Sequence, residues 1–176
     1  MTKKAALLLA FILSAAPGGA DVLNAAPGGF TVRSTIELSA VPLAVYLAVV
    51  DRVGSWWDGD HTWSGRASNL TIDARAGGWF CEKLPGGSVQ HMAVVWADRG
   101  KTLRLTGALG PLQEMAVSGS MTWSLTENAG RTRIELTYTV GGYAPGGLEA
   151  VAKPVDAVLA AQLQRLKQFI ETGRPQ

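Results

Sequence analysis

The sequence predicts an α+β domain in which one antiparallel sheet of about seven strands curves around a long C-terminal helix. Apolar and polar residues alternate through most of residues 69–140, which is the period of half-buried strands. Short turn sequences such as Pro85–Ser88 separate these runs, so consecutive strands form hairpins and must be antiparallel. After Pro154, apolar residues recur at steps of three and four, which predicts a helix with one apolar face. Because the sheet needs a cover for its own apolar face, we expect this helix to lie across it.

The first predicted elements are one strand and two short helices. Residues 30–39 alternate between apolar and polar side chains and form the first strand. Pro42 favours the start of a short helix that continues to Val50, and Arg52–Trp57 is typical of a second helical turn. The loop that follows, Asp58–Ser64, carries Asp58, Asp60 and His61.

The rest of the chain is predicted to be strands and one helix. Further strands are expected near residues 70–75, 79–84, 89–97, 102–107, 121–126 and 133–140, and residues 108–117 fit neither pattern. The final helix is expected from Pro154 to Glu171, roughly 27 Å at 1.5 Å per residue, with Gly173 and Pro175 ending it.

The N-terminus has the pattern of a secretory signal peptide over residues 1–20. Lys3 and Lys4 precede an apolar run, Ala5–Ala16, and small residues up to Ala20 fit a cleavage site before Asp21. The apolar run is shorter than the roughly 20 residues that span a bilayer. We therefore expect a periplasmic or secreted protein with no stable membrane insertion after cleavage. Residues 21–29 are expected to be a flexible lead-in, residues 30–172 the folded domain and residues 173–176 a tail.

Composition excludes several classes of function. The chain has 16 Lys+Arg and 14 Asp+Glu; removal of Lys3 and Lys4 leaves 14 basic residues, so the mature net charge is near zero. Without a basic cluster, nucleic acid is not an expected partner. Cys81 is the single cysteine, which excludes a disulfide framework and a Cys-rich zinc site. No metal-ligand spacing is present, so neither a metal nor a cofactor is expected, and the oligomeric state is left open.

The order of elements resembles the helix-grip fold of the START/SRPBCC superfamily, which includes polyketide cyclases and the Hsp90-activator homology domain. The resemblance covers Gly29–Thr172, and its short motifs are Val41–Tyr46, Trp56–Trp57, Ala76–Phe80, Gly86–Gly87 and Leu103–Leu105. It implies a cavity between the sheet and the last helix. It leaves the guest open, because members bind lipids, hormones or polyketides, or act as enzymes or co-chaperones.

Large side chains on the inner face are the candidate lining of such a cavity. They are Trp57, Phe80, Val95, Leu105, Trp123, Leu136 and Tyr138. Of these, Trp57, Phe80, Trp123 and Tyr138 are predicted to bind the ligand, together with His61 from the loop at the expected mouth. The expected ligand is a small hydrophobic molecule, either lipid-like or aromatic and polyketide-like.

A carboxylate and an imidazole are predicted to meet on one hairpin. If Gly86–Gly87 forms a two-residue loop, Glu82 lies directly opposite His91. Inside a cavity, this pair suits general acid/base catalysis in a cyclase/dehydrase-type lyase or isomerase, with His91 and Glu82 as catalytic residues. At the rim of the sheet it would be a simple ion pair. A third hypothesis is a protein-interaction module without a pocket, which would use the outer face of the sheet or residues 108–117.

Overall fold

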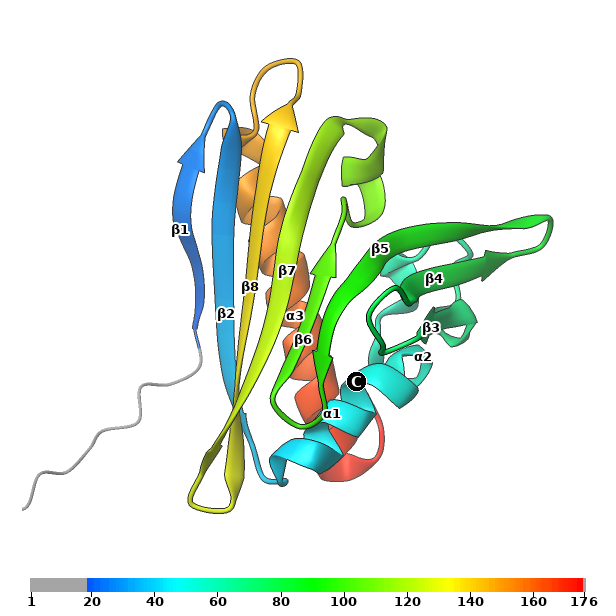
Figure 1. Ribbon diagram of the computed structural model, residues 1–176, viewed down its shortest axis with the longest axis vertical. Coiled ribbons are helices and arrows are strands. Elements are labelled where there is room, and N and C mark those ends of the chain that lie inside the picture. Colours follow the sequence, from blue (N-terminus) through cyan, green and yellow to red (C-terminus); the bar gives the residue numbers. More distant parts are fainter. Residues whose placement is uncertain (1–18, 176) are drawn as a thin grey trace, which may run out of the picture.

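The computed structural model describes residues 19–175, so nearly all of the expected signal peptide lies outside the described residues. One eight-stranded antiparallel sheet has the order β1-β2-β8-β7-β6-β5-β4-β3, and the long helix α3 packs on it (Figure 1). The strands are β1 Ala20–Ala26, β2 Gly29–Leu38, β3 Leu70–Ile72, β4 Trp79–Leu84, β5 Gly87–Asp98, β6 Thr102–Thr106, β7 Ala116–Asn128 and β8 Arg131–Tyr143. The α-helices are α1 Pro42–Asp51, α2 Val53–Trp56 and α3 Glu149–Thr172, and the 3-10 helices are η1 Gly59–His61, η2 Ala67–Asn69 and η3 Gly110–Glu114.

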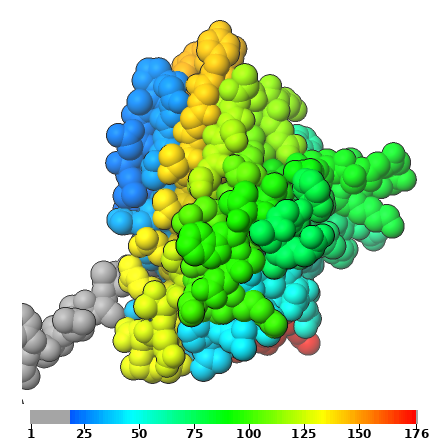
Figure 2. All heavy atoms as spheres, in the orientation of Figure 1, coloured from blue at the N-terminus to red at the C-terminus, as the bar shows by residue number. Residues whose placement is uncertain are grey.

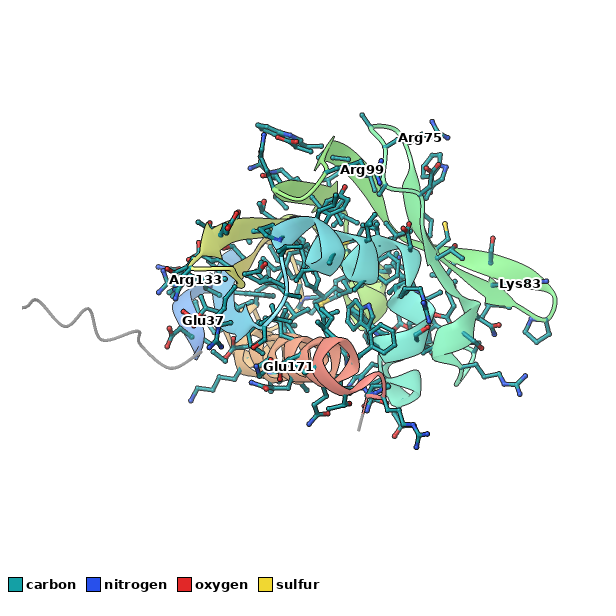
Figure 3. The ribbon with its side chains drawn as sticks, turned by 90° about the horizontal axis from the view of Figure 1, so that it is seen from below. Glu37, Arg75, Lys83, Arg99, Arg133 and Glu171 are labelled. Atoms are coloured by element: carbon teal, nitrogen blue, oxygen red, sulfur yellow. The ribbon has the colours of Figure 1, made fainter. Side chains whose placement is uncertain are left out.

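The sheet bends around α3, and α1 and α2 close the end of the core near β3 (Figure 1). Seen from below, the charged side chains of Glu37, Lys83 and Glu171 lie on the outside of the molecule (Figure 3). The interior holds the apolar side chains of β2, β6, β7 and β8, which alternate between buried and more exposed positions. The predicted α+β helix-grip architecture is therefore confirmed. Within residues 19–175, no helix is long and apolar enough to cross a membrane.

The strand β1 corrects the prediction of a flexible lead-in and raises the number of strands to eight. Residues Ala20–Ala26 pair with β2 along most of their length, with a register shift between Val22 and Asn24. In this edge strand only Val22 is even half-buried. Backbone hydrogen bonds to β2 hold this strand in place. Because few of its side chains are buried, its sequence lacks the apolar alternation by which a strand is recognised.

The final helix begins at Glu149, five residues before the predicted start at Pro154. Pro154 has no N–H to donate within the helix, and this missing bond is why the sequence suggested a boundary there. Leu148 and Ala152 are fully buried on the sheet and hold the first turn in place. The 24-residue helix is about 36 Å long. Gly173 ends it in the left-handed conformation at φ 78°, as predicted.

The hairpin of β4 and β5 pairs in a register that differs by two residues from the predicted one. Pro85 and Gly86 form the two-residue loop, so Glu82 lies opposite Val89 rather than opposite His91. Side chains alternate across a strand with a period of two, so this error leaves Glu82 and His91 on the same face. His91 becomes a diagonal neighbour of Glu82, within reach of its side chain. The turn end of the hairpin projects from the body (Figure 1, Figure 2).

A β-bulge at His91 brings two consecutive side chains inward. Gln90 pairs with Cys81 and Met92 pairs with Phe80, which leaves His91 as the extra residue of β5. Both His91 and Met92 are buried as a result. Along β5, the side chains that face the interior therefore switch at the bulge from odd-numbered to even-numbered positions. This is why neither the odd nor the even positions of this strand are all apolar.

A second bulge, at Val95, turns side chains outward and corrects one predicted lining residue. Val94 pairs with Leu105 and Trp96 with Arg104, so Val95 is the extra residue. Val95 is 49% exposed and does not face the interior. Trp96 is also exposed, with the Arg104 guanidinium 5.1 Å from its ring centroid on the outer face of the sheet.

Candidate functional site

A cavity of about 360 Å³ lies between α3, the sheet and two loops. Its walls are mostly apolar. The sheet and the α2–β3 region contribute Trp57, Asp60, His61, Thr62, Trp63, Leu70, Phe80, His91 and Tyr138; the η3 segment contributes Leu109, Gly110, Pro111, Leu112 and Met115; α3 contributes Val151, Pro154, Val155, Val158 and Leu159. Asp60, His61 and Trp63 are exposed, so the mouth lies at the loop that carries them. A volume of this size is within the range of small-molecule sites.

Tyr138 holds the η3 segment over the cavity. Its hydroxyl donates to the Gly107 carbonyl oxygen at 3.0 Å and accepts from the Leu109 amide at 3.1 Å. Burial raises the pKa of this phenol to about 12, and the Leu109 amide acts weakly against that shift. The ring of Tyr138 lines the cavity, while its polar group is already occupied by the backbone.

The mouth loop is attached to α3 through Gln162. This side chain is completely buried; its Oε1 accepts from the Asp58 amide at 2.9 Å and its Nε2 lies 3.4 Å from His61 Nδ1. The indole of Trp57 donates to the His61 carbonyl oxygen at 3.2 Å. These bonds fix the loop at the entrance and orient the apolar faces of the aromatic rings towards the interior.

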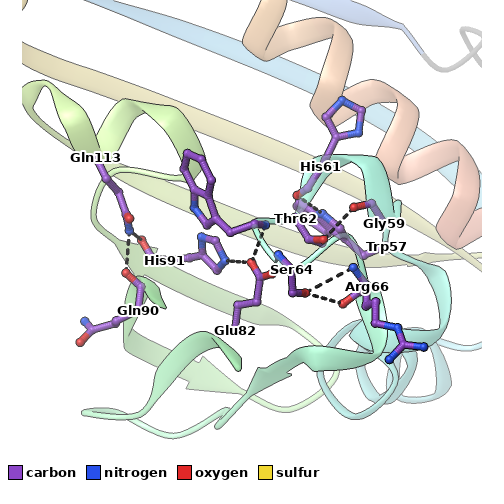
Figure 4. A network of polar contacts seen from close by, with 11 residues as sticks. Trp57, Gly59, His61, Thr62, Ser64, Arg66, Glu82, Gln90, His91 and Gln113 are labelled. Atoms are coloured by element: carbon purple, nitrogen blue, oxygen red, sulfur yellow. Dashed lines mark hydrogen bonds and ion pairs between the residues drawn. The ribbon is translucent and has the colours of Figure 1, made fainter. Parts of the chain in front are cut away.

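Glu82 and His91 form a buried hydrogen-bonded pair in the wall of the cavity. His91 Nε2 lies 3.0 Å from Glu82 Oε2, and their side chains are 4% and 0% exposed. The Glu82 carboxylate also accepts from the backbone amides of Trp63, at 3.1 Å, and Ser64 (Figure 4). The mouth loop, β4 and β5 are thus joined by one carboxylate.

The charge states of the pair follow from burial and hydrogen bonding. Burial acts to raise the pKa of Glu82, but the hydrogen bonds from Ser64, Trp63 and His91 outweigh it and lower the pKa. Burial lowers the pKa of His91, and the hydrogen bond and charge of Glu82 offset this only in part. At neutral pH the pair therefore consists of a carboxylate and a neutral imidazole.

Most of the predicted site residues lie around the cavity, and one does not. Trp57, His61, Phe80, His91 and Tyr138 line it, and Glu82 lies behind His91. Trp123 is buried elsewhere in the core, where its ring centroid is 6.2 Å from that of Trp56. Leu105 and Leu136 are likewise buried core residues that do not line the cavity.

The α3 and η3 sides of the cavity and the role of Gln162 were not predicted from the sequence. Val155, Val158 and Leu159 were expected on the face that covers the sheet, and their place at a void could not be read from periodicity. Val151 lies before the predicted start of the helix at Pro154. Gln162 did leave a signal, since it is a polar residue between Leu159 and Leu166 on the apolar face. The η3 segment left none, because Gly110 and Pro111 interrupt any pattern of apolar residues. Within residues 19–175, no group of three or more His, Cys, Asp or Glu is placed to hold a metal ion.

The sequence matches one protein-family model over residues 29–171, described as polyketide cyclase / dehydrase and lipid transport. The chain belongs to this family. The matched segment begins with β2 and ends within the last turn of α3, so it includes every wall of the cavity. No curated protein matches the chain in sequence.

Solved structures share the fold of this polyketide cyclase/dehydrase family member at low identity. EF2215 of Enterococcus faecalis, titled a conserved protein of unknown function, is 18% identical with a TM-score of 0.60, over 89% of this chain and 78% of that one. CalU16 of Micromonospora echinospora is 17% identical with a TM-score of 0.58, over 89% and 86%. The Aha1 dimer of Colwellia psychrerythraea is 18% identical with a TM-score of 0.58, over 81% and 97%. These likenesses show the common fold.

Proposed function

We propose that this protein binds a small hydrophobic molecule in the cavity between α3 and the sheet. The observation that carries the proposal is the apolar cavity of about 360 Å³, which has His91 as a buried polar group in its wall. Membership of a family described by cyclase, dehydrase and lipid-transport activities supports it. The hypothesis of a pocketless interaction module requires a filled interior, and the cavity argues against it.

The volume limits the size of the guest. At about 30 Å³ for each water-sized group, 360 Å³ has room for roughly a dozen non-hydrogen atoms. This matches one or two fused rings or a short alkyl chain, and it is too small to enclose a lipid with two long acyl chains. The enclosed part of the ligand is therefore a compact apolar body.

Filling the cavity from α3 is expected to abolish binding without unfolding the protein. Val158→Trp puts an indole into the space, whereas the matched variant Ala157→Trp adds the same group one residue away, at an exposed position. Isothermal titration calorimetry with 2-naphthol should show binding to wild type and Ala157→Trp and at least a tenfold weaker affinity for Val158→Trp. Thermal unfolding checks that all three are folded. Equal binding by the two variants would contradict a site in this cavity.

A second candidate function is acid/base catalysis of the cyclase/dehydrase type, with His91 as base and Glu82 as the group that orients it. The 3.0 Å contact between them in the cavity wall favours it. Exchange of the α-protons of 2-tetralone in D2O, followed by NMR, tests it. We expect His91→Gln to slow that exchange by a factor on the order of 100 or more, and an unchanged rate would remove this candidate.

We also propose that the protein is exported. Lys3, Lys4 and the apolar run Ala5–Ala16 support this, although they lie outside the described residues. Cleavage before Asp21 removes Ala20, the first residue of β1, and leaves six residues of the strand, five of which pair with β2. The intact mass of protein recovered from the exported fraction of cells that express the full chain should correspond to a start at Asp21. A mass that still includes residues 1–20 would contradict cleavage.

A further inference from the structure

One ring nitrogen of a residue that lines the cavity has no hydrogen-bond partner among the described residues. His91 Nδ1 is buried and unpaired, whereas Nε2 of the same ring contacts Glu82. Three other buried side-chain atoms in residues 19–175 share this state, on Ser34, Tyr46 and Asp156, but none of these residues lines the cavity. A buried polar atom without a partner destabilises the folded state, so this nitrogen is a candidate contact for a guest.

The contacts of Glu82 determine what His91 Nδ1 offers. The Glu82 carboxylate accepts hydrogen bonds from two backbone amides and has no proton to donate. In its contact with His91 it must therefore be the acceptor, so His91 Nε2 carries the proton. In a neutral imidazole with its proton on Nε2, Nδ1 has a free lone pair and no hydrogen. Nδ1 is therefore an acceptor that only a donor group can satisfy.

The other polar groups of the wall do not compete for the same role. The Tyr138 hydroxyl makes two bonds to the backbone around η3, and His61 lies at the exposed mouth. The Phe80 ring packs beside His91 with ring centroids 5.1 Å apart. Among the side chains of the described lining residues, His91 Nδ1 is thus the buried polar atom without a partner, and its surroundings are mostly apolar.

We infer that the guest carries a hydrogen-bond donor, such as the hydroxyl group of an alcohol or a phenol, which donates to His91 Nδ1 while its apolar body packs against α3. This inference rests on the proposed ligand-binding function and deepens it. An ether or a ketone of the same shape has no proton to donate and leaves Nδ1 unsatisfied. A carboxylate has none either, and it also brings a second negative charge close to Glu82. The pocket therefore selects neutral hydroxylated molecules over anions and over their O-methylated analogues.

Calorimetry with two matched probes tests the inference, at a pH where 2-naphthol is neutral. 2-Naphthol has the donor, and 2-methoxynaphthalene keeps the ring system without it. We expect wild type to bind 2-naphthol about tenfold more tightly, which corresponds to about 1.4 kcal/mol. In His91→Phe, which keeps a flat ring at this position but has no acceptor, the ratio should fall to about one. In Val155→Ala, which removes apolar contact alone, both affinities should fall and the ratio should stay near ten.

A direct measurement covers the case in which His91→Phe does not fold. The ¹⁵N resonance of Nδ1 in wild type should shift on addition of 2-naphthol and not on addition of 2-methoxynaphthalene. Equal affinities of wild type for both probes, or a preference that persists in folded His91→Phe, would overturn the inference and leave the ligand-binding proposal standing. Failure of both probes to bind wild type would instead overturn the proposed function.

Discussion

Glu82→Ala is expected to lower the free energy of unfolding by about 3–5 kcal/mol, because it leaves three donors unsatisfied and opens a void. The substitution leaves the amides of Trp63 and Ser64 and the Nε2 proton of the buried His91 without their acceptor. It also adds a void where a completely buried side chain was. Because one carboxylate joins β4, β5 and the mouth loop, we expect the loop to loosen as well. Urea unfolding of variant and wild type measures the change.

Two controls separate the buried network from a general effect of charge. Glu127→Ala removes a carboxylate from an exposed position of β7 and should change stability by no more than about 0.5 kcal/mol. Glu82→Gln keeps one acceptor oxygen but turns an NH₂ group towards the donors. Its loss of unfolding free energy should therefore lie between those of Glu82→Ala and Glu127→Ala. A loss below about 1 kcal/mol for Glu82→Ala would mean that water satisfies the freed groups and that the pair is not structurally important.

Leu166→Ala is expected to destabilise the protein by about 2–5 kcal/mol. Leu166 is completely buried on the face of α3 that packs against the sheet, in the half of the helix beyond the cavity. Truncation removes buried apolar surface and leaves a hole that the rigid sheet closes only partly. Gln164→Ala, at an exposed position on the same helix, is the matched control and should be close to neutral. Similar urea midpoints for the two variants would show that this part of α3 does not pack tightly against the sheet.

The Glu82–His91 pair shows how far sequence reasoning could reach. The two residues were expected to be directly opposed, and the structure instead has them diagonal, with a different turn and a bulge. The expectation that they share a face survived because the register error was two residues, a whole period of the strand. An error of one residue would have placed them on opposite faces. The side chains meet because of the bulge and the diagonal geometry, neither of which the local pattern contains.

Trp123 and Trp57 show what the sequence could not predict about the cavity lining. Both were predicted to bind the ligand because they are large aromatic residues expected on the inner face, where the cavity was expected. Trp57 lines the cavity, and Trp123 packs against Trp56 away from it. Alternation tells which face a residue occupies, but it carries no information on whether the opposing layer touches that face or leaves a gap.

Local periods of apolar residues were enough to predict the α+β class, the antiparallel order of consecutive strands and the amphipathic helix that covers the sheet. The edge strand β1, the start of α3 before Pro154, the two bulges of β5 and the cavity beside His91 are visible only in the folded protein. Each of these depends on how distant segments pack or pair, since β1 is held by hydrogen bonds rather than burial and the cavity is the space that α3, η3 and the sheet leave between them. Local patterns record which surfaces are buried, while the distance between two buried surfaces is a property of the assembled fold.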